Sequence, residues 1–322
     1  MHVDFKLGLS CNNKCRHCVM EPTRRNLLAS GQGVDTAWAD LEALFNKWRA
    51  DGLTSLTLTG GEPTLREDFW RILDLAAATG AAVGVQTNGR RLAEAKEKLA
   101  ALKGKNVFFV VALHGPEAGI HDRITQAPGS FAETVEGLGN LVSLGFPVCG
   151  KLVLSNHNLA ALPATLDFMR RLGLKEALVA FPHAEDFTLP ELRDVLPRYA
   201  EVKKVLLEIK RDHWPLEVLK WESIPFCVFP APEFFPQSID LDYMRQRLKN
   251  ENTTIEMTMT GERLDWNESR RSIKSKSPRC RGCLLDLVCE GVWSEYLDLY
   301  GDDDFAPVTD QEVVSRFLER LP

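Results

Sequence analysis

The chain has 322 residues, of which 44% are hydrophobic and 26% charged, a balance typical of a folded globular protein. Its net charge of -6 and pI near 5.7 argue against a nucleic-acid partner, because nucleic-acid-binding proteins usually carry a basic surface. No apolar run approaches the roughly 18 residues of a membrane span, and no basic segment followed by an apolar one opens the chain as an export signal would. We therefore expect a cytoplasmic protein that uses neither a membrane nor a nucleic acid.

Short apolar runs alternate with helical stretches over the first part of the chain, which predicts an α/β fold of repeated strand–helix units. The expected strands are residues 3–9, 55–59, 82–87, 107–115, 147–155 and 176–181. The expected helices between them are residues 35–50, 67–78, 91–102, 130–144 and 159–172. Six such units form either a partial TIM-type barrel or an open doubly wound sheet. In both folds, ligands bind at the carboxyl ends of the strands.

The repeat ends after residue 183. Residues 189–211 read as helical, with Pro197 as a kink or a restart. Residues 270–281 carry six basic side chains and no acidic one. We interpret this basic run as solvated surface, with a site for an anionic substrate or a tuned metal centre as the alternative. We expect three parts, which are a core at 1–183, a helical linker at 184–222 and a smaller domain at 223–322.

The eight cysteines of the chain fall mainly into two groups. Cys11, Cys15 and Cys18 follow the first expected strand, and three more lie within residues 280–289. In a reducing compartment, clustered cysteines are better candidates for metal ligands than for disulfides. Cys149 stands among apolar residues, and we interpret it as a small buried hydrophobe.

Three thiolates spaced as in CNNKCRHC leave a metal centre one ligand short. A zinc site needs four ligands, and His17 is awkwardly placed to be the fourth because its neighbour Cys18 already takes that point. Iron–sulfur clusters normally take four protein ligands as well, so three leave one iron open to a small chelating molecule. A zinc loop and unligated cysteines remain the alternatives.

The stretch TGGEP follows the second expected strand and places Gly60, Gly61 and Glu62 at its end. Glycines let the main chain approach a ligand closely, and a carboxylate matches an ammonium group. An ordinary turn before a helix is the alternative interpretation.

Further polar residues stand at the ends of later strands and are candidate cofactor contacts: Thr87, Asn88, His114, Lys151 and Ser155. Each has a plainer interpretation as a hydrogen-bonded loop residue or as a solvated residue on the rim of the sheet.

The order of CNNKCRHC, GGEP and LHG along successive strands resembles the radical S-adenosylmethionine (SAM) superfamily. The resemblance implies a partial (β/α)6 barrel and a 4Fe-4S cluster held by Cys11, Cys15 and Cys18, whose open iron binds SAM. It implies that the GGE stretch contacts the SAM amino group, and we count His17 among the cofactor contacts. A polar residue that commonly holds the SAM ribose in this family aligns with Ala112, so that contact passes to His114 or to another strand.

Cys280, Cys283 and Cys289, followed by EGVWSEYLDLYG, resemble the SPASM and twitch extensions of the same superfamily. The full extension has a further cysteine where Trp293 stands and more cysteines upstream, whereas this chain offers only Cys227. The resemblance implies one auxiliary 4Fe-4S cluster, ligated by these four thiols. A closed four-cysteine zinc site is the alternative.

The resemblance implies reductive cleavage of SAM to methionine and a 5′-deoxyadenosyl radical, which abstracts hydrogen from a substrate. We expect a peptide side chain as the substrate, as in ribosomal peptide maturases, although the chain begins almost at the first strand and shows no leader-binding domain before it. A small-molecule metabolite is the alternative substrate, and a zinc-stapled scaffold without activity is the alternative of another class. The electron donor would be a flavodoxin or ferredoxin, and no acid–base residue is identified.

Overall fold

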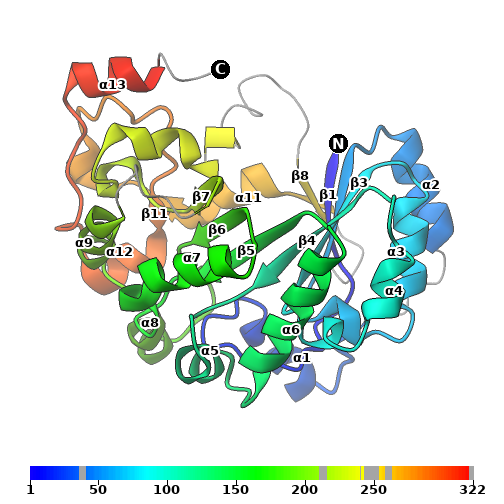
Figure 1. Cartoon of the computed structure of the whole chain (residues 1–322). Helices are drawn as coiled ribbons and strands as arrows, with labels where there is room; N and C mark the ends of the chain where they lie inside the picture. Colours follow the sequence, from blue (N-terminus) through cyan, green and yellow to red (C-terminus); the bar gives the residue numbers. More distant parts are fainter. Residues whose placement is uncertain (36–40, 210–215, 240, 243–253, 258–262, 319–322) are drawn as a thin grey trace.

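The computed structural model describes residues 1–35, 41–209, 216–239, 241–242, 254–257 and 263–318 (Figure 1). The strands are β1 (His2–Lys6), β2 (Ser55–Thr59), β3 (Ala82–Thr87), β4 (Val107–Ala112), β5 (Val148–Val153), β6 (Glu176–Ala180), β7 (Val218–Glu222), β8 (Thr254–Met257), β9 (Arg263–Asp265), β10 (Lys274–Ser275) and β11 (Val292–Trp293). The helices are α1 (Glu21–Ala29), α2 (Leu41–Ala50), α3 (Phe69–Ala77), α4 (Lys96–Ala100), α5 (Ala118–Thr125), α6 (Ser130–Ser143), α7 (Leu162–Arg171), α8 (Leu189–Val195), α9 (Tyr199–Glu208), α11 (Trp266–Ile273), α12 (Ser294–Tyr300) and α13 (Gln311–Leu318).

One sheet organises the molecule, in the order β7-β6-β5-β4-β3-β2-β1-β8-β9. Each strand from β1 to β6 pairs in parallel with the next one along the chain, which confirms the predicted α/β fold. Parallel neighbours need a crossover, and α2, α3, α6 and α7 lie in the crossovers between consecutive strands (Figure 1). The start of the helix expected at 35–50 lies outside the described residues, and α2 forms its later part.

The described residues form five strands beyond the six that the sequence predicts, and two of them, β7 and β8, bear on the predicted domains. β7 lies inside the expected helical linker, which therefore holds α8, α9 and a seventh parallel strand. β8 lies within residues 223–322 but pairs in parallel with β1, so the segment expected as a separate domain contributes to the main sheet. The division of the chain into domains stays a prediction.

The two faces of the sheet differ in character. In β5, Gly150 faces the helices, because a Cβ there would lie 2.8 Å from the sulfur of Met169 in α7. The alternate residues Cys149, Lys151 and Val153 point to the opposite side and are partly exposed. Cys149 is therefore half-buried on the inner face. This inner face is thus partly exposed at β5, whereas the helix-covered face belongs to the apolar core.

The chain segments that follow β1 and β2 run in close contact. The N–H of Gly61 donates to the carbonyl of Gly8 at 2.8 Å, and the N–H of Glu62 donates to that of Ser10 at 2.7 Å. A Cβ on Gly60 would lie 2.2 Å from the Gly8 oxygen, and Gly60 also has a φ of +122°. The glycines of GGE thus allow backbone to pack on backbone.

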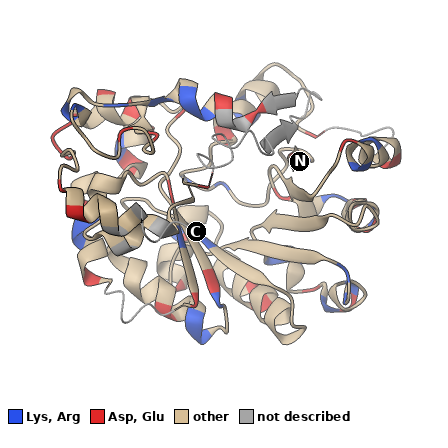
Figure 2. Cartoon of the chain, turned by 90° about the horizontal axis from the view of Figure 1, so that it is seen from above, with Lys and Arg blue, Asp and Glu red and all other residues tan. Residues whose placement is uncertain are grey.

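The C-terminal residues pack against α9. The Tyr296 hydroxyl accepts from the N–H of Tyr199 at 2.9 Å, and Arg198 forms an ion pair with Asp304 at 2.9 Å. Across the described residues, no helix is both long and apolar enough to cross a bilayer. Figure 2 shows basic and acidic residues interspersed along the outer helices.

The close approach at Gly61 predicts a stability effect of Gly61→Ala. Its Cβ would lie 2.3 Å from the Ser10 carbonyl oxygen, so the backbone must shift, and we expect unfolding to become easier by roughly 2 kcal/mol or more. Gly139→Ala is the matched control, because nothing lies within 4 Å of its Cβ on exposed α6, and it should stabilise by about 0.5–1 kcal/mol. Urea unfolding of both variants measures the difference; equal stabilities would contradict the prediction.

Candidate active site

The first three cysteines lie on the loop between β1 and α1. Burial raises the pKa of Cys11 to about 11 and also raises the pKa values of Cys15 and Cys18. Besides burial, the neighbouring Cys18 and Cys11 raise the pKa of Cys15, so the three thiols are close enough to repel one another when charged. They ionise together only when a metal centre compensates their charge. This donor set fits a metal site.

The cysteine loop is held by residues that follow β3. The Asn88 side-chain amide donates to Asn12 Oδ1 at 2.7 Å and lies 4.0 Å from the Cys11 sulfur. Arg90 donates from Nη1 to the Asn12 carbonyl at 2.5 Å and to Asn13 Oδ1 at 2.9 Å. The sequence predicts Asn88 as a cofactor contact but does not single out Arg90. The NGR stretch after the third strand was the signal that could have found it.

The Glu62 carboxylate joins the ends of β2 and β3. It accepts from the N–H and hydroxyl of Thr64 at 3.1 and 2.6 Å, from the Thr87 hydroxyl at 2.7 Å, and from the N–H of Asn88 at 2.6 Å. Burial raises the pKa of Glu62, and these donors oppose the rise. The sequence predicts that Gly60, Gly61, Glu62 and Thr87 contact a ligand. In this structure the two glycines pack on the backbone that follows β1, and Thr87 donates to Glu62.

Two histidines meet at the first cysteine loop: His17 belongs to the loop, and His114 follows β4. The His17 and His114 rings pack edge to face with centroids 4.6 Å apart, and His114 also stacks on His121. Burial lowers the pKa of His17 to about 4 and that of His114 well below its usual value, so both imidazoles are neutral at pH 7. The Cys15 sulfur and one ring nitrogen each of His17 and His114 lie within 4.8 Å of one another.

Ser155 and Lys151 on the β5 side have protein partners. The N–H and hydroxyl of Ser155 donate to Asn158 Oδ1 at 2.7 and 3.2 Å, so Ser155 shapes a turn. Asn158 in turn donates to the His114 carbonyl at 3.1 Å and so fixes that residue, a role that the sequence does not predict. Lys151 faces the inner side of the sheet, where its ammonium lies 3.5 Å from Glu222.

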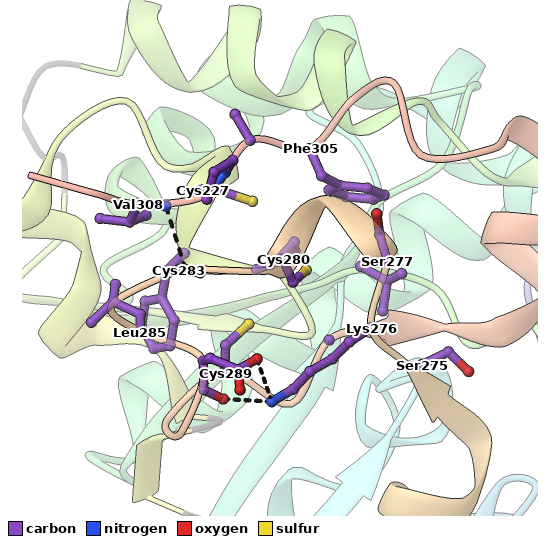
Figure 3. Close-up of a pocket in the computed structure, with 17 residues that line it drawn as sticks. Cys227, Ser275, Lys276, Ser277, Cys280, Cys283, Leu285, Cys289, Phe305 and Val308 are labelled. Carbon is purple, nitrogen blue, oxygen red and sulfur yellow. Dashed lines mark hydrogen bonds and ion pairs between the residues drawn. The ribbon is translucent and has the colours of Figure 1, made fainter.

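The second group of cysteines shares one cavity (Figure 3). Its wall includes Cys227, from just after β7, together with Cys280, Cys283 and Cys289, and about 480 Å³ of empty space lies inside, the part open to solvent included. Burial raises the pKa of Cys227, and Cys280 and Cys283 raise it further. The N–H of Val308 points at the Cys283 sulfur at 3.4 Å. The structure thus brings Cys227 into one cavity with three thiols that stand much later in the sequence.

Known proteins resemble this chain over different lengths. An AdoMet-dependent heme synthase of Methanosarcina barkeri (strain Fusaro / DSM 804) is 27% identical over 265 residues, which are 80% of this chain and 68% of that protein. The mycofactocin maturase MftC of Mycobacterium ulcerans (strain Agy99) is 30% identical over 160 residues, which are 49% of this chain and 41% of that protein. The chain therefore spans about two thirds of the first relative and about two fifths of the second.

The fold is also found in a crystal structure of Streptococcus suis SuiB bound to S-adenosylmethionine. The TM-score is 0.63 at 16% identity, over 96% of this chain and 76% of that one. A family model of the Radical SAM superfamily matches residues 6–169, about half of the chain. That segment runs from the last residue of β1 into α7 and contains the first cysteine loop, the GGE stretch and the histidines described above. The chain therefore belongs to the radical SAM superfamily, and the protein is an enzyme.

Proposed function

We propose that the protein abstracts a hydrogen atom from a substrate bound on the inner face of the sheet. Cys11, Cys15 and Cys18 would ligate a 4Fe-4S cluster, with SAM bound beside it. When bound, the cluster would supply the electron that cleaves SAM. Cleavage gives methionine and a 5′-deoxyadenosyl radical, and this radical takes the hydrogen. The observation that carries the proposal is a loop with three mutually interacting buried thiols at the strand ends of a radical SAM fold.

The residues around this loop position the ligands. Arg90 and Asn88 fix the backbone and side chain of Asn12, and so set the conformation of the segment between Cys11 and Cys15. The Asn13 N–H, at 3.4 Å, and the Asn88 amide point at the Cys11 sulfur. Such donors stabilise a thiolate and raise the potential of a bound cluster.

The four cysteines of the second cavity support a further part of the proposal. We infer that Cys227, Cys280, Cys283 and Cys289 ligate an auxiliary 4Fe-4S cluster of the SPASM or twitch type. Their number satisfies a cluster fully, so this centre would bind no SAM and would serve as an electron acceptor for the substrate radical or as a substrate-binding site. Four thiolates also suit zinc, and iron analysis separates the two.

We propose a peptide side chain as the substrate. Support comes from relatives that carry the names mycofactocin maturase MftC and subtilosin biosynthesis protein AlbA, and from the likeness to SuiB, which has been crystallised with its precursor peptide SuiA. A flavodoxin or ferredoxin in the cytoplasm would supply the electron. These relatives align with only about half of this chain.

A small anionic metabolite is the second candidate substrate. The relatives named heme synthase align with 80% and 79% of this chain, well beyond the barrel half. The inner face also carries a charge network in which Arg270 and Lys274 bind Glu290 at 2.6 and 2.8 Å. The basic run was thus wrongly interpreted as wholly solvated, because Arg270 is fully buried and Lys274 nearly so.

Lys151 joins this network through Glu222. The Glu222 carboxylate lies 3.5 Å from the Lys151 ammonium and 3.7 Å from Arg270. Lys151 is the most exposed of the cations, with 26% of its side chain accessible. A substrate carboxylate could pair with the exposed part of Lys151, whether it belongs to a peptide or to a metabolite.

Anaerobic reconstitution with iron and sulfide, followed by reduction with SAM present, tests the reaction. Wild-type protein should form 5′-deoxyadenosine and carry roughly eight irons per chain, as expected for two 4Fe-4S clusters. Cys15→Ala should lose SAM cleavage, whereas Cys280→Ala/Cys283→Ala should lose about half of the iron and retain cleavage. Brown, iron-loaded wild-type protein that forms no 5′-deoxyadenosine would contradict the proposal.

Substrate assays separate the two substrate classes. Short peptides encoded near the gene are compared with small carboxylates as substrates of the reconstituted protein.

The charge network predicts an acid-dependent stability that Glu222 controls. Burial alone would raise its pKa, but Lys151 and Arg270 outweigh burial and hold the pKa of Glu222 at about 2 against an ordinary 4.5. A lowered carboxyl pKa stabilises the fold above pH 4.5, and this contribution is lost as the pH falls toward 2. Glu222→Gln should therefore lower the unfolding free energy of cluster-free protein by about 2–3 kcal/mol at pH 6, and by much less near pH 3.

Glu217→Gln is the control for Glu222→Gln. Glu217 pairs with Lys175 at 3.1 Å, but both side chains are about 70% exposed, so its loss should cost less than about 1 kcal/mol at either pH. Urea titrations at the two pH values give the comparison. A pH-independent effect of Glu222→Gln would show that Lys151 and Arg270 do not lower the pKa of Glu222.

A further inference from the structure

A second kind of metal site overlaps the first cysteine loop. The Cys15 sulfur and one nitrogen each of His17 and His114 lie within 4.8 Å of one another. Bonds of 2.0–2.3 Å in a tetrahedral zinc site place its ligand atoms roughly 3.3–3.8 Å apart. Side-chain adjustments of about 1 Å therefore bring these three atoms into zinc-binding geometry, and water supplies the fourth ligand as in open zinc sites.

The two histidines are also short of partners. His17 is 9% exposed and His114 only 2%, and among the described residues the Nδ1 atom of each lacks a hydrogen-bond partner. A buried polar nitrogen without a partner carries a free-energy cost that a bound metal ion would remove. Both rings are thus buried, and each has an Nδ1 atom that could bind a metal ion.

The backbone of His114 is held by two side chains. Its carbonyl accepts from the Asn158 amide at 3.1 Å, and its N–H donates to His121 Nδ1 at 3.2 Å. The His17 ring packs against the His114 ring, so the position of one restricts the other. The two imidazoles are therefore held beside the Cys15 thiol before any metal arrives.

We propose that the cluster-free protein binds one Zn²⁺ through Cys15, His17 and His114. One thiolate with two imidazoles is a zinc-type donor set, unlike the three thiolates of the cluster loop. Binding releases the Cys15 thiol proton to solvent and involves no change of oxidation state. Because the cluster also needs Cys15, the two metal centres exclude each other, and zinc delays cluster assembly. The zinc site stands on geometry alone, while its competition with a cluster rests on the proposed function.

Titration of cluster-free protein with Co²⁺ and Zn²⁺ tests the site. The Cys280→Ser/Cys283→Ser background disables the second cysteine cavity, so one equivalent should remain, and Co²⁺ should show thiolate charge-transfer absorption. His17→Asn, His114→Asn and Cys15→Ser should each weaken zinc binding by about 100-fold or more, because even outer partners of metal ligands contribute 10–100-fold. Cys11→Ser and Cys18→Ser are the matched controls and should change the affinity by less than about tenfold.

Two results would overturn the zinc site. One is the absence of a one-to-one complex, and the other is a loss of binding in Cys11→Ser or Cys18→Ser as large as in Cys15→Ser, with the histidine variants unaffected. Circular dichroism of each variant shows whether it is folded. Iron uptake with and without preloaded zinc, measured in the Cys280→Ser/Cys283→Ser background, tests the competition: zinc should slow uptake by this protein and not when His114→Asn is added. If zinc binds as described and no cluster forms even without zinc, the proposed function fails and the zinc site stands.

Discussion

The buried Glu62 carboxylate is the interaction on which the candidate active site depends. It accepts four hydrogen bonds from residues at the ends of β2 and β3, and the preceding glycines bring the same segment onto the backbone after β1. A buried carboxylate is tolerated only when its oxygens are satisfied, so these strand ends have one low-energy arrangement. That arrangement also positions the cysteine loop, because the Asn88 N–H donates to Glu62 and the Asn88 side chain donates to Asn12.

Much of the sheet could be predicted from the sequence. The strands expected at 55–59 and 82–87 match β2 and β3, because each is a run of apolar and β-branched residues bounded by turn residues. β7 was missed because two of its five residues, Lys220 and Glu222, are charged. The Glu222 carboxylate is accommodated by Lys151 of β5, a partner that the local sequence does not reveal. β8 was missed because its register depends on β1, far away in the sequence.

The candidate site was predicted only at the level of residue type and strand end. Motif spacing identified the residues that cluster around the first cysteine loop, but it does not tell whether Glu62 meets a ligand or Thr87, because that depends on the register of neighbouring strands. Arg270 shows the same limit. Its position in a basic run indicated solvent exposure, whereas its partner Glu290 stands 20 positions away and buries it. When folding brings two residues together from distant positions, the sequence around either residue does not reveal the contact.

The pairing of β8 with β1 has a consequence for the way the molecule is made. His2 aligns with Thr254, so β1 stays without one of its neighbours until the residues around Thr254 have been synthesised. Contacts of such long sequence separation slow folding, since a large loop must close before they form. An unpaired edge of β1 during that interval is a site for association with other nascent chains, and a chaperone would be most useful there.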